Sequence, residues 1–228
     1  MKGTAKFGFQ LTPKIIYDSL LDAIGIDGTL VLPLYNFDFP KTGFFDINNT
    51  PSQMGVLTEL GRLSPDSVRT GHPIYSFSVV GKHKYLFKDI DNISGYGKDS
   101  PFALIKELNG KIAIIGLTDQ DSMTSYHFVE ESNNVNYRYF KDFSGVYFNF
   151  KGEKKKKTYK LFVRNIEKGV LTDVNRMMEY LWEKGFYKGS KPDENYGMRT
   201  IKFEDLYRET DQIIKRGMAH EFLYSIEK

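Results

Sequence analysis

Residues 112–131 read Ile-Ala-Ile-Ile-Gly-Leu-Thr-Asp-Gln-Asp-Ser-Met-Thr-Ser-Tyr-His-Phe-Val-Glu-Glu, and this stretch decides the fold class. Its first four residues form an apolar run that ends at Gly116, a pattern that predicts a buried strand followed by a turn. Thr118, Asp119 and Ser122 offer N-cap chemistry shortly afterwards. The stretch therefore predicts a strand, a loop and the start of a helix.

The same stretch contains a candidate catalytic group. Thr124, His127 and Glu130 are three residues apart, so on a helix they share one face. A histidine with an unperturbed pKa near ~6.5 is suited to general-base catalysis, and a neighbouring carboxylate can fix its tautomer. The plainer interpretation is a capped helix start with a half-buried, hydrogen-bonded histidine. Spacing alone favours that interpretation, because such triples are common.

Composition excludes several classes of protein. The chain has 228 residues, 40% hydrophobic and 27% charged, with a net charge of +3 that is too mild to predict a nucleic-acid-binding face. No stretch approaches the ~18 apolar residues of a membrane span, and the N-terminus lacks the apolar core of a signal peptide. We therefore expect a cytoplasmic protein with no nucleic-acid or membrane partner. The absence of cysteine excludes a thiol nucleophile, and four histidines far apart predict no metal site.

Helices and strands alternate along the first half of the chain. Thr12 as N-cap and Pro13 in the first turn predict a helix over residues 13–24. A continuously apolar strand over residues 29–34 follows, as expected when both faces of a sheet are covered. The next segment, 35–49, is an aromatic loop, and loops of this length inside a domain are often functional.

Capping and periodicity predict the remaining elements. Thr50 and Gln53 have the spacing of a capping box and predict the start of a helix. A glycine-rich loop over residues 94–101 precedes another helix, with Ser100 as N-cap. The other predicted elements are strands at 76–81, 112–115 and 196–203 and helices at 101–108, 173–183, 203–214 and 219–226.

Alternating aromatic and aliphatic residues over 136–163 predict a β-meander, with a hairpin tip at Gly152 and Glu153. Lys154 to Lys157 beside this tip are best explained as a solvated turn that protects a sheet edge, and phosphate or nucleic-acid binding is the weaker alternative. The order of elements predicts an α/β protein in which helices flank a mixed central sheet and a β-meander is inserted in the second half. No repeat or linker interrupts residues 1–228, so we expect a single domain.

Five short segments follow one another in a recognisable order. They are Gly28-Thr-Leu-Val-Leu-Pro33; Phe45-Asp46 with Thr50-Pro51-Ser52 and Gly55; Arg69-Thr-Gly-His72-Pro73 with Ser76 and Gly81; Gly97, Ser100 and Pro101; and Ile114 to Gly116 followed by Thr124, His127 and Glu130. Each is weak alone. Together, across residues 6–215, they resemble the aminoglycoside 3-N-acetyltransferase (antibiotic N-acetyltransferase) family.

The resemblance implies an acyltransferase that uses acetyl-CoA and transfers the acyl group directly to an amine. In that reading His127 takes the proton of the attacking amine, and Glu130 or Asp46 orients the imidazole. Thr124 or Ser76, or a backbone N–H, would stabilise the oxyanion. The residues implied in cofactor binding are Gly95, Gly97, Ser100 and Ser76, and those implied in acceptor binding are Asp46, Thr50, Ser52 and His72.

Two questions stay open at this stage. The acceptor is an aminoglycoside or a neutral or anionic amino sugar such as a nucleotide-linked amino-deoxysugar, and the mildly basic chain fits the second somewhat better. The family normally has a further helix and a strand, ending in His-Ser-Ser, before the residue 13–24 helix. Because Phe7-Gly8 resembles the end of that strand, we keep a truncated, inactive homologue with a binding or structural role as the alternative. The many aromatic residues leave room for a homodimer.

Overall fold

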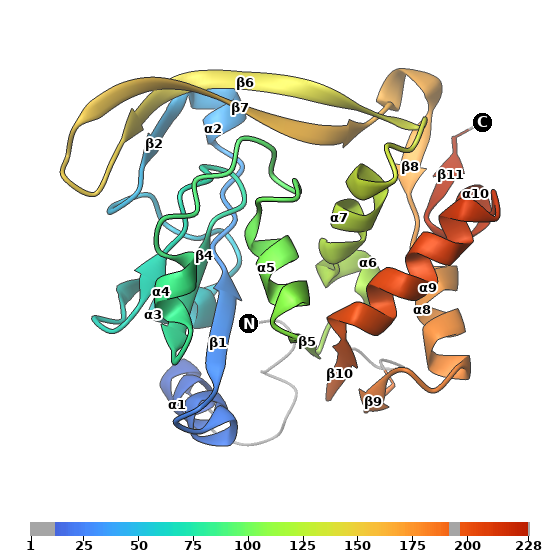
Figure 1. The fold of residues 1–228 in the computed structure, drawn as a ribbon, viewed down its shortest axis with the longest axis horizontal. Coiled ribbons are helices and arrows are strands. Elements are labelled where there is room, and N and C mark those ends of the chain that lie inside the picture. Colours follow the sequence, from blue (N-terminus) through green and yellow to red (C-terminus); the bar gives the residue numbers. More distant parts are fainter. Residues whose placement is uncertain (1–11, 192–196, 228) are drawn as a thin grey trace.

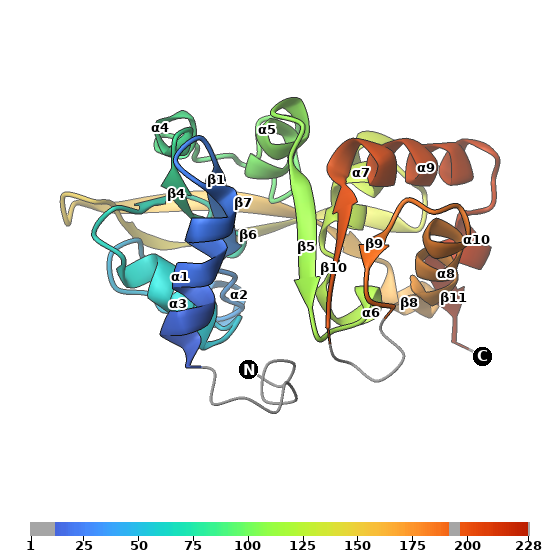
Figure 2. The same ribbon diagram turned by 90° about the horizontal axis from the view of Figure 1, so that it is seen from below.

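The computed structural model describes residues 12–191 and 197–227, and the fold is shown in Figure 1. The N-terminal half is built on an antiparallel sheet of β1 (Thr29–Pro33), β4 (Phe77–Gly81) and β3 (Val68–Arg69), in the order β1-β4-β3. Helices α1 (Pro13–Ile24) and α3 (Val56–Leu63) pack on one side of this sheet, and α4 (Lys84–Phe87) lies on the other (Figure 2).

The C-terminal half repeats this layered arrangement around β5 (Lys111–Ile115), β10 (Met198–Lys202) and β9 (Lys188–Gly189), in the order β5-β10-β9. Figure 2 shows the two layers of helices on either side of it. One layer contains α5 (Pro101–Glu107), α7 (Ser125–Ser132) and α9 (Phe203–Lys215). The other contains α6 (Asp119–Ser122), α8 (Asn175–Glu183), α10 (Ala219–Phe222) and the strand pair β8 (Val170–Thr172) and β11 (Tyr224–Ile226).

A long hairpin joins the two halves. Strands β6 (Arg138–Phe148) and β7 (Lys154–Arg164) pair along their whole length and run above the other elements in Figure 1. Strand β2 (Phe44–Asp46) adds to the hairpin in parallel, next to α2 (Phe39–Thr42), and a 3-10 turn, η1 (Ile166–Lys168), leads from β7 to β8. The underside of the hairpin therefore covers the region between the two sheets.

The α/β class and most of the elements expected from the sequence are confirmed. Helix α1 begins where predicted, and the Thr12 hydroxyl accepts a hydrogen bond from the Ile15 N–H at 3.2 Å. Strands β1, β4 and β5 and helices α5, α8 and α9 lie within a few residues of their predicted positions. The strands pair in four small sheets, in which β2–β6 is the parallel pair among the named strands. The prediction of a single domain stays a prediction.

The helix predicted to start at Thr50 is wrong, because α3 begins at Val56. The Thr50 hydroxyl accepts from the Asp46 N–H at 2.9 Å, and the Gln53 side chain accepts from the Phe37 N–H at 2.9 Å. Both side chains are thus used to fold the preceding loop. Gly55, with φ 107°, stands immediately before the helix in a backbone conformation that favours glycine.

The meander is also wrong in its first part, since residues 138–148 form one strand of a two-stranded hairpin. Gly145 of this strand lies against the backbone of Gly43, just before β2. A Cβ at Gly145 would lie 2.4 Å from the carbonyl oxygen of Gly43, so only glycine allows the two strands to approach this closely. At the C-terminus, the predicted helix over residues 219–226 ends at Phe222 and gives way to β11.

A buried ion pair holds the C-terminal half together and corrects another expectation. Asp119, predicted as a helix cap, is 1% exposed and accepts from Arg199 at 2.7 Å. The hydroxyls of Tyr126 and Tyr187 donate to the same carboxylate, at 2.8 Å and 2.5 Å. Arg199 also donates to the Leu117 carbonyl. These contacts tie β10 and the segment before β9 to the loop that leads into α7.

We expect Arg199→Met to lower the free energy of unfolding by about 3–5 kcal/mol, because it leaves a buried carboxylate without its cation. The matched control is Lys82→Met, which removes an exposed ion pair with Asp27 and costs at most about 1 kcal/mol. Urea unfolding followed by circular dichroism measures both values. Equal midpoints for the two variants would contradict the structural role of the buried pair.

Candidate active site

Helix α7 positions the candidate catalytic residues. Its buried side chains, which include Tyr126, Phe128 and Val129, pack into the main core. These contacts fix the rotation of the helix about its axis. His127 and Glu130, three residues apart, point towards the hairpin. There the Glu130 carboxylate contacts both His127 and Arg138, which lies at the start of β6.

The Glu130 carboxylate is the centre of this constellation. Its Oε2 atom lies 2.7 Å from His127 Nδ1 and 2.8 Å from Arg138 Nε, and the residue is only 1% exposed. A carboxylate accepts hydrogen bonds, so His127 donates from Nδ1 and carries its lone pair on Nε2. Nε2 has no protein partner within the described part of the chain. The arrangement therefore presents a neutral imidazole with a free basic nitrogen.

Burial and charge set the protonation of this group. Burial, and then the charge of Arg138, lower the pKa of His127, and the hydrogen bond to Glu130 opposes them only in part. Burial would raise the pKa of Glu130, but the charge of Arg138 and the hydrogen bond from His127 outweigh it and lower that pKa. At neutral pH the histidine is thus neutral and the glutamate ionised, as a general base and its orienting group require.

His127 opens onto a pocket of about 390 Å³ beneath the hairpin. The rings of Tyr75 and Tyr96 line one side, and the Tyr96 ring lies edge-on to the imidazole with 5.3 Å between the centroids. Lys141 and Arg164 line the side formed by the hairpin. The pocket combines aromatic surface, a basic nitrogen and positive charge, and no Asp or Glu lines it among the residues that the structure describes.

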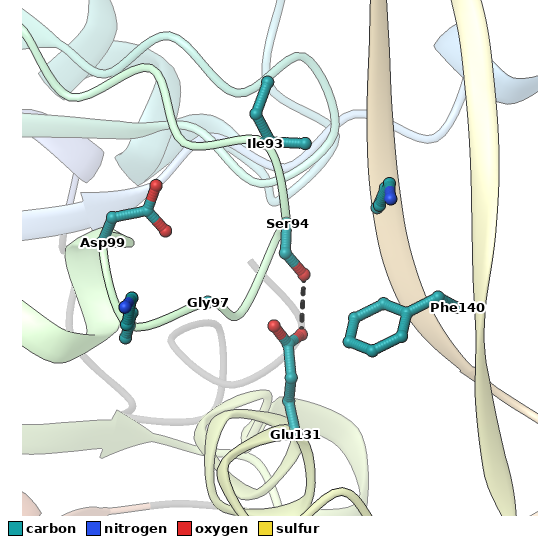
Figure 3. A pocket seen from close by; sticks show the side chains of 8 residues that line it. Ile93, Ser94, Gly97, Asp99, Glu131 and Phe140 are labelled. Atoms are coloured by element: carbon teal, nitrogen blue, oxygen red, sulfur yellow. Dashed lines mark hydrogen bonds between the residues drawn. The ribbon is translucent and has the colours of Figure 1, made fainter.

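A second pocket, of about 330 Å³, lies where the glycine-rich loop meets α7 and the hairpin (Figure 3). Ser94 donates to Glu131 Oε2 at 2.8 Å across it. Burial, together with the nearby charge of Asp99, raises the pKa of Glu131, against the hydrogen bond from Ser94. The two consecutive glutamates of α7 therefore face different surroundings, because Glu130 contacts His127 and Arg138 whereas Glu131 lines this pocket.

The glycine-rich loop binds to the hairpin through its own backbone. The Gly95 N–H donates to the Lys160 carbonyl at 3.0 Å, and the Gly97 N–H donates to the Ser94 carbonyl at 3.2 Å. These two donors are thus not free to bind a phosphate in this conformation, contrary to the expectation for the loop. Gly97 does line the second pocket. A cofactor-binding role for Gly95 and Gly97 stays a prediction.

The two serines predicted in cofactor binding lie in the protein interior. Ser76 is fully buried, and its hydroxyl contacts Arg69 and the Leu34 carbonyl. Ser100 is 1% exposed and precedes α5 without a side-chain capping bond. Neither lines either of the two pockets. Their positions give the predicted contacts with acetyl-CoA no support.

Three of the residues predicted to bind the acceptor, Asp46, Thr50 and Ser52, lie in a folded loop that does not line the His127 pocket. Asp46 accepts from the N–H groups of Asn48 and Asn49 at 2.9 Å and 3.2 Å. Ser52 exchanges a hydrogen bond of 2.8 Å with Thr58 in α3. These contacts account for the side chains as loop-forming groups, and acceptor binding by Asp46, Thr50 and Ser52 stays a prediction.

Arg69 explains why this loop is fixed. The guanidinium is buried and donates to the carbonyl groups of Ile47 and Thr50 at 3.0 Å and 2.6 Å. It also lies over the Phe45 ring, 5.0 Å from its centroid. Burial, with the charge of Arg62, lowers the pKa of Arg69 to about 10, so the side chain remains a cation at neutral pH.

His72 is fully buried and neutral. Its Nδ1 accepts from the N–H groups of Ile74 and Tyr75 at 3.2 Å and 3.0 Å, which holds the turn before β4. Burial lowers the pKa of His72 to about 3. A histidine bonded in this way stabilises a turn. The structure thus brings His127, Glu130 and Arg138 together and leaves His72 outside that group.

Sequence reasoning missed five residues of the site, namely Tyr75, Tyr96, Arg138, Lys141 and Arg164. Each lies on a strand or loop whose partner comes from elsewhere in the chain, so no local pattern marks it. Thr124, predicted with His127, does lie at the start of α7, and it lines neither of the two pockets. Within residues 12–191 and 197–227, no group of three or more metal-ligating side chains is present.

None of the helices in the described ranges combines the length and the apolar character needed to cross a membrane.

We expect the pKa of His127 to lie below its ordinary value of 6.5, so that the ring protonates only as the pH falls through that lower value. Glu130→Gln should lower the pKa further, because the carboxylate is the group that raises it. Histidine-selective NMR titration measures both values, with Glu153→Gln at the exposed hairpin tip as the control. A pKa of 6.5 or more for His127, or a rise in Glu130→Gln, would contradict this account.

Comparisons with known proteins identify what the chain resembles. The family profile described as Aminoglycoside 3-N-acetyltransferase matches residues 5–214. The SPbeta prophage-derived aminoglycoside N(3')-acetyltransferase-like protein YokD of Bacillus subtilis is 29% identical over 138 residues, 50% of each chain. Aminoglycoside N(3)-acetyltransferase IV of Salmonella sp. is 27% identical over 132 residues, 55% of this chain and 48% of that protein. The chain thus aligns with about half the length of these curated relatives.

Solved structures share the fold more completely than the sequences do. AAC-IIIb in its binary complex with CoASH superposes with a TM-score of 0.75 at 17% identity, over 90% of this chain and 84% of that one. The crystal structure of YokD from Bacillus subtilis gives a TM-score of 0.73 at 20% identity, over 93% and 89% of the two chains. At these identities the likeness establishes the fold.

Proposed function

The chain belongs to the aminoglycoside 3-N-acetyltransferase family, and from this premise we propose that it transfers an acetyl group from acetyl-CoA to the amine of an amino sugar. The observation that carries the proposal is the geometry around Glu130. Its buried carboxylate holds His127 in the tautomer that leaves Nε2 free at a pocket of substrate size. This is the arrangement that a direct transfer requires.

The reaction follows from these groups without a covalent enzyme intermediate. The amine nitrogen attacks the thioester carbonyl while Nε2 of His127 accepts the amine proton. The C–S bond then breaks, and the leaving thiolate of CoA takes the proton from the His127 imidazolium, which returns to the neutral form. Glu130 stabilises the imidazolium that forms between these steps, and Arg138 keeps Glu130 ionised throughout.

The oxyanion of the tetrahedral intermediate needs a hydrogen-bond donor. Neither predicted hydroxyl lines the His127 pocket, but Thr124 lies at the start of α7 near His127 in the sequence, whereas Ser76 is bonded within the interior, so Thr124 is the better placed of the two. Thr124 lies one turn before His127 on the same helix face. The oxyanion contact of Thr124 is part of the proposal.

The proposed acceptor class is an amino sugar, either an aminoglycoside or a nucleotide-linked amino-deoxysugar. Family membership favours the first, whereas the positive charge in the His127 pocket favours the second. We place the reaction in the cytoplasm, where acetyl-CoA would be the co-substrate. The intact contacts among His127, Glu130 and Arg138 favour an active enzyme over an inactive homologue.

We expect His127→Ala to lower the rate of CoA release by about 10²–10⁴-fold, the contribution typical of a positioned general base. The assay mixes the protein with acetyl-CoA and a panel of aminoglycosides and nucleotide-linked amino sugars. His220→Gln, which changes an exposed histidine in α10, should keep the wild-type rate. Unchanged turnover in His127→Ala would reject His127 as the base, and no release by the folded wild-type protein with any acceptor would reject the proposed function.

A further inference from the structure

The charge of the His127 pocket differs from what a polycationic ligand needs. Arg138, Lys141 and Arg164 line this pocket, and among the described residues no carboxylate does. Glu130 lies behind the imidazole and its charge is already matched by Arg138, at 2.8 Å. An aminoglycoside bears several ammonium groups, which would meet uncompensated positive charge here. The electrostatics of the pocket therefore favour a ligand with negative charge.

Two of the three cations are free to bind such a ligand. Arg138 is held by Glu130, by the Phe162 carbonyl at 3.2 Å and by Thr172 at 3.3 Å. Lys141 and Arg164 are exposed, and neither side chain makes a hydrogen bond or ion pair with the described part of the protein. Lys141 only lies over the Phe143 ring, 5.7 Å from its centroid. Their charged ends thus keep their full capacity to donate hydrogen bonds.

An exposed cation on a strand is most often a solvated surface group, and Lys155 at the hairpin tip is one, with an exposed ion pair to Glu153 at 3.7 Å. Lys141 and Arg164 differ from it in their surroundings. Both line the concave pocket with aromatic walls that His127 also lines. A ligand held by Arg164 would therefore lie within reach of the proposed base.

We propose that the acceptor carries a phosphate or a carboxylate in addition to its amine, and that Arg164 and Lys141 bind this anionic group. The proposal rests on the proposed acetyl transfer and narrows its acceptor to an anionic amino compound. Arginine and lysine bind phosphate and carboxylate through charge-assisted hydrogen bonds, which are the strongest class of hydrogen bond in proteins. The anchor would hold the acceptor beside His127 while its amine stays free to react.

Acetyl-CoA also contains phosphate groups, so a site that binds phosphate would accept either the acyl donor or an anionic acceptor. The test therefore uses inorganic pyrophosphate as the anionic probe, gentamicin as the polycationic probe and coenzyme A as the competitor. Binding is followed through the imidazole signals of His127 in histidine-selective NMR spectra. Arg164→Gln and Lys141→Gln are compared with Lys155→Gln, which removes the same charge from the tip of the same hairpin.

We expect pyrophosphate to shift the His127 signals saturably, also when coenzyme A is present at saturation. Arg164→Gln and Lys141→Gln should each weaken its affinity about tenfold, the effect of losing one charge-assisted hydrogen bond, and Lys155→Gln should leave it within about twofold. Gentamicin should bind more weakly than pyrophosphate. The proposal is overturned by an absence of pyrophosphate binding, by equal affinities in wild type and Arg164→Gln, or by tighter gentamicin binding. Displacement of pyrophosphate by coenzyme A would assign the site to the donor and overturn it as well.

The CoA-release assay separates this inference from the proposed function. Transfer to polycationic acceptors at a rate that Arg164→Gln leaves unchanged would reject the anionic subsite and retain the acetyltransferase. Pyrophosphate binding that depends on Arg164, without CoA release for any amine, would retain the anion site and reject the acetyltransferase.

Discussion

The structure around the site depends on one buried carboxylate, that of Glu130. An isolated ionised carboxylate in the interior is very costly, so its burial requires partners that remain in place. Arg138 at the start of the hairpin and His127 on the same helix supply them. Because Arg138 belongs to β6, the charge pair also attaches the hairpin to α7. The ion pair between Glu130 and Arg138 thus has two effects. It influences the protonation of His127, and it holds the hairpin above the pocket.

Two further buried arginines, Arg69 and Arg199, satisfy irregular segments of the chain. Arg69 binds the carbonyl groups of the loop after β2, and Arg199 binds the carboxylate and carbonyl of the loop after β5. Irregular segments carry backbone groups that have no ladder partner, so a fixed guanidinium with five donors is an effective way to satisfy them. Arg69 and Arg199 therefore fix two segments that regular secondary structure cannot fix, whereas Arg138 links a helix to two strands.

The sequence predicted elements well where their determinants are local. Thr12 and Pro13 act on the next turn of their own helix, and five consecutive residues are enough to predict β5 from its apolar run. The prediction failed where a side chain suited to capping the next helix forms hydrogen bonds with another part of the chain. Thr50 and Gln53 fold the loop before them, and Asp119 pairs with a residue 80 positions away. The catalytic face of α7 follows from a spacing of three, whereas Arg138 and Arg164 enter the site only because the hairpin pairs them with each other. No local pattern could have revealed that contact.

The hairpin places two pockets of different charge next to one helix turn. Lys160 lines the pocket that contains Glu131 and Asp99, whereas Leu161, the next residue of β7, lines the pocket that contains His127. On α7, the consecutive residues Glu130 and Glu131 likewise face different surroundings: Glu130 contacts His127, and Glu131 lines the other pocket. Of these two pockets, as lined by the described residues, the Glu131 pocket contains the carboxylates, beside Lys98 and Lys160, and an anionic group meets Lys141 and Arg164 in the His127 pocket. The electric field of a narrow site acts on a charged group before contact is made. The two pockets would therefore attract differently charged groups of the substrates. The amine must lose a proton before it can attack the thioester. Positive charge and a neutral base both favour the uncharged amine, so the His127 pocket is suited to this step.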